Sequence, residues 1–246
     1  MFLPDSKSAI HKAWLYRLLG AIYDSQILAG HLYFKGGTCA AMLGWLDRFS
    51  IDLDFDFIGQ DREIKTVKKE LEKIFTELGL TISDRSKKVP QYFLKYQTPA
   101  GERNTIKIDI TYPPPKANVY QPYHFDDIDR IIYCQTIETM FANKLVAVLD
   151  RWEKNKAIAA RDLYDIHHFF MNGYGYEQAV IVERRKQTAG QHLKELRKFI
   201  DKKVSQSLID QDFNHLLAPD KFQKIRKVLK NEVLMFLRDA AEREEK

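Results

Sequence analysis

The sequence contains no apolar run close to the roughly 20 residues that a membrane-spanning helix needs. Its first 30 residues also lack the basic start, apolar centre and small-residue cleavage site of a secretion signal. We therefore expect a protein that does not associate with membranes and works in the cytoplasm.

Cysteine is scarce, because only Cys39 and Cys134 are present, in separate segments without the spacing of a zinc site. We expect reduced thiols rather than a disulfide framework. Glycine and proline are scattered, so no low-complexity tract predicts disorder. With 246 residues, of which 45% are hydrophobic, the chain can form one large domain or two smaller ones.

The net charge of +5 is modest and comes mostly from the C-terminal end. Residues 177–246 hold 16 Lys and Arg against 12 Asp and Glu, which gives +4 of the total. Basic stretches such as residues 221–230 can attract a nucleic-acid backbone, but exposed helices also carry such charges for solubility. The charge alone leaves both interpretations open.

The N-terminal part combines helical and strand periodicity. Apolar residues at helical spacing predict helices over residues 5–29, 40–45 and 65–78. Alternating or β-branched stretches predict strands over residues 31–34, 51–58, 80–83, 92–96 and 105–111. These elements predict a mixed sheet with flanking helices, in an α/β (α+β) fold.

The sheet is expected to end at Pro113-Pro114-Pro115, because proline has no amide hydrogen to donate to a neighbouring strand. A loop is predicted from there to about residue 130. The periodicity is then helical, over residues 137–151, 159–171, 176–186, 192–204 and 221–241. We therefore predict an α/β lobe in residues 1–130 and a helical bundle in residues 131–246.

Residues 48–57 show the most informative pattern in the chain. On a strand, Asp52, Asp54 and Asp56 share one face, and the apolar residues between them share the other. Carboxylates about 7 Å apart along a strand repel one another, and a divalent cation between them would relieve the repulsion. The alternative is a strand with an acidic solvent face, against which the poor strand propensity of aspartate counts.

Two glycines lie upstream, in Lys35-Gly36-Gly37-Thr38, between a predicted strand and a predicted helix. Glycine lets the backbone approach a phosphate, whose charge exposed N–H groups and a helix N-terminus can meet. Taken alone, two glycines more often mark a simple turn.

Together, a strand, Gly-Gly-Thr, a short helix and a strand with Asp-x-Asp resemble the core of the nucleotidyltransferase fold. Lys-Gly-Gly-Thr followed by Arg-x-Ser-x-Asp-x-Asp-Phe is similar to the AbiEii/AbiGii toxin family of the polymerase-β-like superfamily. The superfamily motifs match Gly37-Thr38, Asp52-Leu53-Asp54, Lys144 and Asp162-Leu163-Tyr164-Asp165 of this chain. Thr38 stands where serine is more usual but keeps the hydroxyl, and the gap from Thr38 to Asp52 is on the long side.

The resemblance implies a two-metal reaction at the N-terminal motifs. Asp52 and Asp54 would be catalytic and hold Mg²⁺ or Mn²⁺ on the triphosphate of an NTP. Gly36, Gly37 and Thr38 would contact that nucleotide.

Three further residues of this lobe have open roles. Asp109, on the predicted strand 105–111, is the candidate for a third metal-binding carboxylate, and an acidic residue on an edge strand is the alternative. Asp56 shares the face of Asp52 and Asp54, but the resemblance leaves it beside the metal pair or in solvent. Arg48 and Ser50 could orient the carboxylates or meet a phosphate, and Arg48 could equally pair with a nearby aspartate.

The resemblance also assigns roles in the helical lobe. Asp162 and Asp165 are three residues apart and so share one helix face, where they can neighbour Lys144. Lys144 would balance triphosphate charge, and the two aspartates would hold the lysine or the nucleotide sugar. Without the resemblance this spacing indicates a solvated face, and Asp165 could also be a salt bridge that packs helices.

The function that the resemblance implies is that of a Mg-dependent nucleotidyltransferase toxin from a toxin–antitoxin system of the kind used in phage defence. It would transfer a nucleoside monophosphate from an NTP to an RNA acceptor such as the 3′ end of tRNA, and an antitoxin encoded alongside would restrain it. We expect the active site in the cleft between the lobes. A two-metal nuclease or phosphohydrolase, or a catalytically silent binding module, are the alternatives.

Overall fold

The computed structural model describes residues 1, 3, 8–86, 90–99, 101–213 and 216–245. Its internal contacts define two compact units, and the chain passes between them three times. The first unit contains Met1–Pro114 and Tyr120–Gln135, and the second contains Pro115–Val119 and Thr136–Lys246. Among the described residues, no helix combines the length and the apolar character needed to cross a bilayer.

The first unit is built on one mixed sheet. In the described part of the chain its strands lie in the order β3-β4-β5-β2-β1-β7-β6. The pairs β1–β7 and β2–β5 are parallel, and the other neighbours are antiparallel. The strands are β1 (Leu32–Lys35), β2 (Asp52–Phe57), β3 (Thr81–Arg85), β4 (Gln91–Lys95), β5 (Thr105–Thr111), β6 (Tyr120–Phe125) and β7 (Arg130–Gln135).

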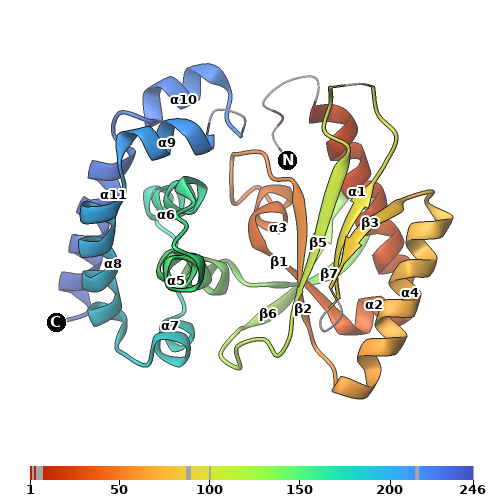
Figure 1. Ribbon diagram of the computed structural model, residues 1–246. Helices are drawn as coiled ribbons and strands as arrows, with labels where there is room; N and C mark the ends of the chain where they lie inside the picture. The colour runs from red at the N-terminus through yellow and green to blue at the C-terminus, as the bar shows by residue number, and fades with distance from the viewer. Residues whose placement is uncertain (2, 4–7, 87–89, 100, 214–215, 246) are drawn as a thin grey trace. The chain divides into compact units, whose positions relative to one another are not determined.

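Helices α1 (Ser8–Asp24), α2 (Gln26–His31) and α4 (Ile64–Glu77) lie on one side of this sheet, as Figure 1 shows. The strand face on this side is apolar, since Phe34, Leu53 and Phe55 are fully buried. Burying such side chains is the main favourable term in folding, at roughly 1.5–3 kcal/mol each. The opposite face of β2 is left to its three aspartates.

The predicted helix over residues 5–29 is two helices, α1 and α2, separated at Ser25, which adopts an extended backbone. Residues 5–7 of that prediction lie outside the described residues. The short helix predicted at 40–45 begins earlier, as α3 (Gly36–Met42), directly after β1.

The predicted loop up to residue 130 was wrong, because it contains β6, and β7 follows at once. The antiparallel partner β7 supports β6 on one side only, so β6 is an edge strand. An edge strand can include Pro122, whose missing amide hydrogen is tolerated there. Because β6 has few apolar residues, the sequence showed no strand pattern there.

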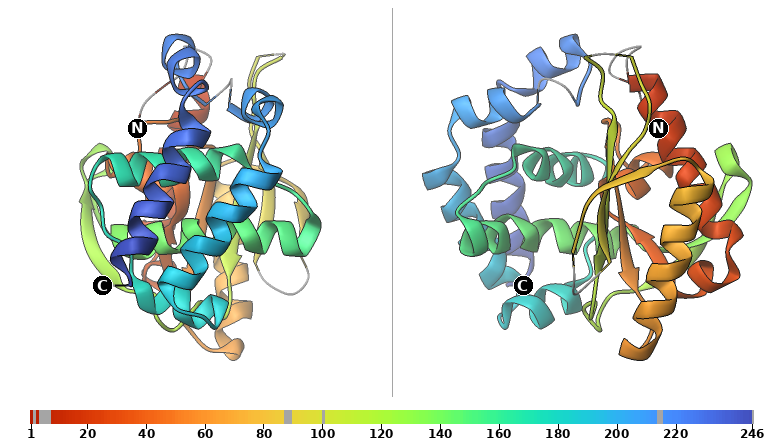
Figure 2. Two further views of the ribbon diagram at one scale, coloured as in Figure 1. Left: turned by 90° about the vertical axis from the view of Figure 1, so that its left-hand side faces the viewer. Right: turned by 45° about the vertical axis from the view of Figure 1, so that its right-hand side comes forward.

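The second unit is helical, as predicted. Its helices in the described residues are α5 (Ile137–Asn155), α6 (Ala160–Met171), α7 (Gln178–Arg185), α8 (Ala189–Lys203), α9 (Gln206–Phe213), α10 (Pro219–Ile225) and α11 (Leu229–Arg243). Figure 2 shows α8 and α11 side by side, and α6 packs on α11 and α5. The helix predicted over 221–241 is divided into α10 and α11, and α9 was not predicted.

The short segment Pro115–Val119 belongs to the second unit because hydrogen bonds fix it there. The Glu183 carboxylate of α7 accepts from the backbone N–H groups of Lys116 and Ala117, at 2.9 and 2.7 Å. The side chain of Asn143 on α5 donates to that of Asn118 at 3.1 Å. These bonds hold the segment as part of the helical bundle.

Candidate functional site

The sheet places the three predicted metal-binding carboxylates on one face of neighbouring strands. Asp52 and Asp54 of β2 are partly exposed. In the parallel pairing of β2 with β5, Asp54 lies opposite Asp109, and Asp52 lies opposite Lys107. Adjacent strands are about 4.8 Å apart, so the backbones of Asp54 and Asp109 are separated by one strand spacing.

Lys107 currently pairs with one of these carboxylates. It lies two residues before Asp109 on the same face, and its ammonium group forms an ion pair with the Asp109 carboxylate. Among the described residues, no three Asp, Glu, His or Cys side chains converge closely enough to form a metal-binding group. The three aspartates are neighbours in the sheet register, but their side chains do not converge on one point. A metal ion would have to compete with Lys107 for Asp109.

Asp56 has a different environment from Asp52 and Asp54. It is fully buried, and its Oδ1 accepts from Lys35 Nζ at 2.6 Å. Its Oδ2 accepts from the Tyr120 hydroxyl at 2.8 Å and from Gln135 Nε2 at 2.6 Å. Both oxygens thus have protein donors, which argues that Asp56 holds its neighbours in place rather than binding a metal.

Lys35 was not singled out from the sequence as a site residue. Its ammonium group also donates to the Thr111 hydroxyl at 2.6 Å, and its backbone pairs with that of Asp54 across β1 and β2. Its side chain remains 18% exposed, on the face that carries the aspartates. Its position at the start of the Lys-Gly-Gly-Thr motif was the available signal.

The turn between β1 and α3 requires glycine at two successive positions. Gly36 has φ +81°, and a Cβ atom there would lie 2.5 Å from Oδ2 of Asp54. A Cβ atom at Gly37 would lie 2.6 Å from a guanidinium nitrogen of Arg48 and 3.1 Å from Oγ of Ser50. The Asp54 carboxylate therefore fills the space in which a side chain at Gly36 would stand.

Thr38, Ser50 and Arg48 connect this turn to the start of β2. The buried Thr38 hydroxyl donates to the backbone carbonyl of Asp52 and lies 2.9 Å from the Ser50 hydroxyl. Arg48 is only 3% exposed and donates to the Phe49 carbonyl at 2.9 Å. Thr38 and Arg48 therefore support the turn from inside the protein, and the partly exposed Ser50 adds to this support.

A buried histidine that the sequence reasoning missed supports the same strand. Nε2 of His11 on α1 lies 2.9 Å from the Ile51 carbonyl, next to Asp52, and Nδ1 lies 2.6 Å from the Tyr96 hydroxyl. Burial lowers the pKa of His11 to about 4, so the ring is neutral at pH 7. A neutral ring that donates to the Ile51 carbonyl fixes where β2 begins.

In the second unit, Lys144 on α5 lies between the two predicted aspartates of α6. Its Nζ is 2.9 Å from Oδ1 of Asp162 and 2.8 Å from Oδ2 of Asp165, and both carboxylates are buried. Arg151 approaches Asp162 at 3.1 Å. Burial alone would raise the pKa of Asp162, but Lys144 and Arg151 outweigh it and hold the pKa at about 2. The solvated helix face that was the alternative is excluded, because these aspartates are buried.

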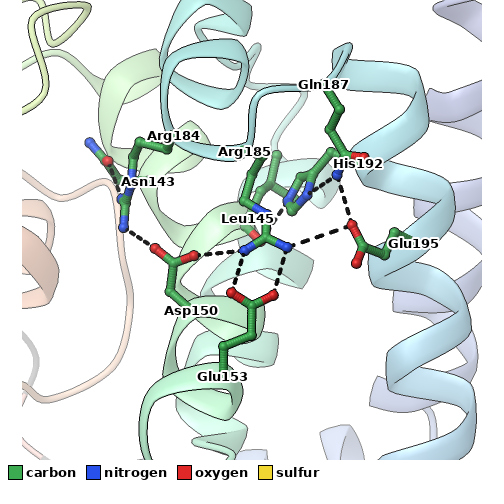
Figure 3. Close-up of polar contacts among 9 residues, drawn as sticks. All are labelled: Asn143, Leu145, Asp150, Glu153, Arg184, Arg185, Gln187, His192 and Glu195. Carbon is green, nitrogen blue, oxygen red and sulfur yellow. Dashed lines mark hydrogen bonds and ion pairs between the residues drawn. The ribbon is translucent and has the colours of Figure 1, made fainter.

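A second ionic cluster anchors α5 close to Lys144 (Figure 3). Arg184 of α7 donates to Oδ1 of Asn143 at 2.6 Å and to Oδ2 of Asp150 at 2.6 Å. Arg185 donates to Asp150 at 2.9 Å and to both oxygens of Glu153 at 3.0 and 2.8 Å. Because Asn143 is next to Lys144, this cluster fixes the helix turn that carries the lysine.

Solved structures with the same fold support the predicted fold class. Two crystal structures of Helicobacter pylori chains, one of them JHP933, are each 21% identical to this chain, with TM-scores of 0.65 and 0.63. They match over 98% of this chain and over 97% and 94% of their own. MenT4, a nucleotidyltransferase toxin of Mycobacterium tuberculosis, is 18% identical, with a TM-score of 0.53 over 97% of this chain and 87% of its own. None of the curated proteins matches this chain.

The sequence itself matches a family model over most of its length. The model describes the nucleotidyl transferase AbiEii toxin of type IV toxin–antitoxin systems, and the match runs from residue 17 to residue 231. It therefore includes the Gly-Gly-Thr turn, the Asp-x-Asp strand, Lys144 and both aspartates of α6. The chain belongs to the AbiEii family of nucleotidyltransferase toxins, as its sequence motifs predicted.

Proposed function

We propose that this toxin transfers a nucleoside monophosphate from an NTP to the 3′ end of an RNA acceptor such as tRNA, using Mg²⁺ or Mn²⁺ bound by Asp52 and Asp54. The observation that carries the proposal is the position of the Asp54 carboxylate, which fills the space that a side chain at Gly36 would take. A turn without side chains, directly beside a carboxylate pair, is the arrangement that a metal-bound triphosphate requires.

The donor set suits a hard divalent cation, because Asp52, Asp54 and Asp109 offer only carboxylate oxygens. When bound there, the cation would stabilise the charge that develops on the attacking and leaving oxygens. Asp109 also pairs with Lys107, so a cation would compete with that ammonium group for the carboxylate. We assign Asp109, rather than Asp56, as the third ligand, since both oxygens of Asp56 accept hydrogen bonds from the protein.

The chain's own groups would position the nucleotide. The turn at Gly36 and Gly37 would lie beside the phosphates, with Asp54 in the space beside Gly36 and Arg48 in the space beside Gly37. Its backbone N–H groups would meet the phosphate charge. The Thr38 hydroxyl is engaged with the Asp52 carbonyl, so we assign Thr38 to fixing the turn against β2. Ser50 and Arg48 would act through the same turn.

Lys144, with Asp162 and Asp165, is the proposed second group. Its ammonium would balance triphosphate charge, and the buried aspartates would hold the lysine at a fixed position. That this group acts on the same nucleotide as Asp52 and Asp54 stays a prediction. Lys144→Met should then raise the KM for the NTP, whereas the helix-packing alternative expects a loss of stability alone.

The type IV toxin–antitoxin classification implies an antitoxin that counteracts this protein. We further propose that the toxin acts in the cytoplasm, where its NTP and tRNA substrates are found. Expression of the toxin alone should slow growth of a bacterial host, and expression of Asp54→Asn should not.

The deciding experiment incubates purified protein with total tRNA, Mg²⁺ and each α-³²P-labelled NTP separately. Asp52→Asn and Asp54→Asn test the metal ligands, and Asp84→Asn, at an exposed aspartate of β3, is the matched control. We expect label on RNA with one preferred NTP, a loss of at least about 100-fold in both test variants, and no change in the control.

Each alternative gives a different result in the same assay. RNA that is shortened without any NTP would identify a nuclease. Label on protein would identify a different acceptor. Absence of label with every NTP, in protein that is folded by circular dichroism, would favour the silent binding module.

A further inference from the structure

The sheet face that carries the aspartates also carries three tyrosines on β1, β6 and β7. The rings of Tyr33 and Tyr133 are stacked, with centroids 5.1 Å apart and an angle of 16° between the planes. Tyr120 meets Tyr33 edge to face, at 5.1 Å and 72°. We call Tyr33, Tyr120 and Tyr133 the tyrosine platform.

The platform is fixed before any ligand binds. The Tyr120 hydroxyl donates to the buried Asp56 carboxylate at 2.8 Å, and Asp56 is held in turn by Lys35 and Gln135. Tyr33 contacts both of the other rings. Aromatic side chains with fixed orientations lose little conformational entropy on binding, which favours their use as recognition surfaces.

The outer part of the platform is open to solvent. Tyr133 is 45% exposed, and Ile131, on the same face of β7, is 70% exposed. Pro122 of β6 pairs with Tyr133 in the antiparallel register, which extends the apolar surface to the sheet edge. A preformed aromatic and aliphatic patch of this kind indicates a ligand with a flat apolar face.

The sheet geometry gives the distance from the platform to the carboxylates. Tyr133 lies two strands away from β2, and the register of β1 pairs Tyr33 with Asp56 and Lys35 with Asp54. With about 4.8 Å between strands and 3.4 Å per residue, Tyr133 and Asp54 are about 12 Å apart. That separation equals three to four base-stacking steps of ~3.4 Å in a nucleic-acid strand.

We propose that the tyrosine platform stacks a nucleobase of the acceptor RNA, a few nucleotides from the 3′ end that receives the transferred nucleotide. This inference rests on the proposed RNA acceptor. Every base has an aromatic face, so the platform would bind the strand with little sequence preference. An apolar ring surface suits a base rather than a phosphate, and its place on β1, β6 and β7 separates it from the proposed metal ligands on β2 and β5.

The first test measures binding without turnover. Asp54→Asn protein is titrated against a fluorescein-labelled single-stranded RNA of about 12 nucleotides, with anisotropy as the readout. Adding Tyr133→Ala should raise the Kd for the RNA by about 10-fold or more. With Tyr133→Phe, which keeps the ring, the Kd should stay within about 2-fold of its value without the substitution. Val182→Ala, at an exposed apolar residue of α7, is the control.

The second test identifies the stacked base. RNAs carrying one abasic ribose at successive positions from the 3′ end are compared on both proteins. With Tyr133 intact, one position should weaken binding markedly, and with Tyr133→Ala that same position should no longer matter. Equal losses on both proteins would show that the ring does not contact that base, and the inference would be wrong.

Steady-state kinetics separate this inference from the proposed function. Tyr133→Ala should raise the KM for tRNA and leave the KM for the NTP unchanged. A rise in the NTP KM alone would mean that the platform holds the incoming nucleotide, which overturns the inference. If wild type labels RNA and Tyr133→Ala behaves identically, only the inference fails. If wild type neither binds nor labels RNA, the proposed acceptor is wrong and the inference fails with it.

Discussion

At Gly36 and Gly37 the missing Cβ atoms make room for side chains that come from other parts of the sequence. Asp54 occupies the space beside Gly36, and the buried Arg48 occupies the space beside Gly37. Because Arg48 is 3% exposed, its guanidinium group has little room to move away. One added methyl group at either glycine would therefore displace the turn or the side chain beside it.

Replacing Gly37 with alanine should reduce both stability and transfer activity. The new methyl group would push on Arg48 and Ser50, and overpacking of this kind costs about 1–3 kcal/mol. Urea denaturation and the labelling assay measure the two effects. Gly30→Ala is the control, since nothing lies within 4 Å of a Cβ atom at that helical position. Equal stability of the two variants would contradict this account.

Asp162 should make the protein sensitive to acid. Its folded pKa of about 2 lies below the ordinary value of 3.8, so its ion pairs contribute stability at pH values above about 4. That contribution, about 2 kcal/mol, is lost as the pH falls from about 4 towards 2. Urea midpoints measured across this range should fall more steeply for wild type than for Asp162→Asn. Asp220→Asn, at an exposed position, should follow wild type.

The distance along the chain between a residue and its partners explains which candidate site residues could be predicted from the sequence. Asp52, Asp54 and Gly37 were predicted because strand alternation and short motifs are visible in a few consecutive residues. Lys35 and His11 were missed, because their partners lie 21 and 40 residues away in the chain. Only the folded sheet shows that Asp56 has three protein donors.

Among helices and strands, local pattern again determined what was predictable. The bounds of β5 agree with the prediction, since its residues alternate between buried and partly exposed. β6 has few apolar residues and a proline, and its structure depends on pairing with β7. The end of α10 at Ile225 was missed because the apolar spacing continues through the break into α11.

Arg184 and Arg185 of α7 both bond to side chains of α5. Replacing Arg185 with leucine would leave Glu153 without its paired bonds, whereas Asp150 would keep Arg184. Asp150 is partly exposed and Glu153 is exposed, so solvent would screen the loss. We expect the free energy of unfolding to fall by about 1 kcal/mol. Arg185→Lys should lie between the two, because lysine cannot form the paired bonds to Glu153. Urea denaturation of the three proteins provides the comparison, and identical midpoints would show that the cluster adds no stability.

The net charge of the entire chain affects how strongly it attracts an RNA acceptor. A net charge of +5, with +4 in residues 177–246, favours association with a polyanion. Basic residues also keep helices soluble, and the salt dependence of RNA binding distinguishes the two interpretations.

Binding of RNA should therefore weaken as salt is added. Each phosphate neutralised by a lysine or arginine contributes a slope of about −0.7 to the plot of log K against log salt for single strands. Anisotropy titrations at several salt concentrations between about 50 and 200 mM would give the slope. Charge-reversal of Lys224 and Lys227 together should make the slope shallower, and a flat plot for wild type would exclude a basic RNA-binding surface.

The three chain passages between the units have a consequence for how this toxin could be inherited or rebuilt. Residues 115–119 are encoded before the last two strands of the first unit, yet they are bonded to Glu183 and Asn143 of the second. No single cut in the gene yields both units whole. A recombination event that replaced the helices from residue 136 onward would therefore leave residues 115–119 behind, without the Glu183 and Asn143 to which they are bonded.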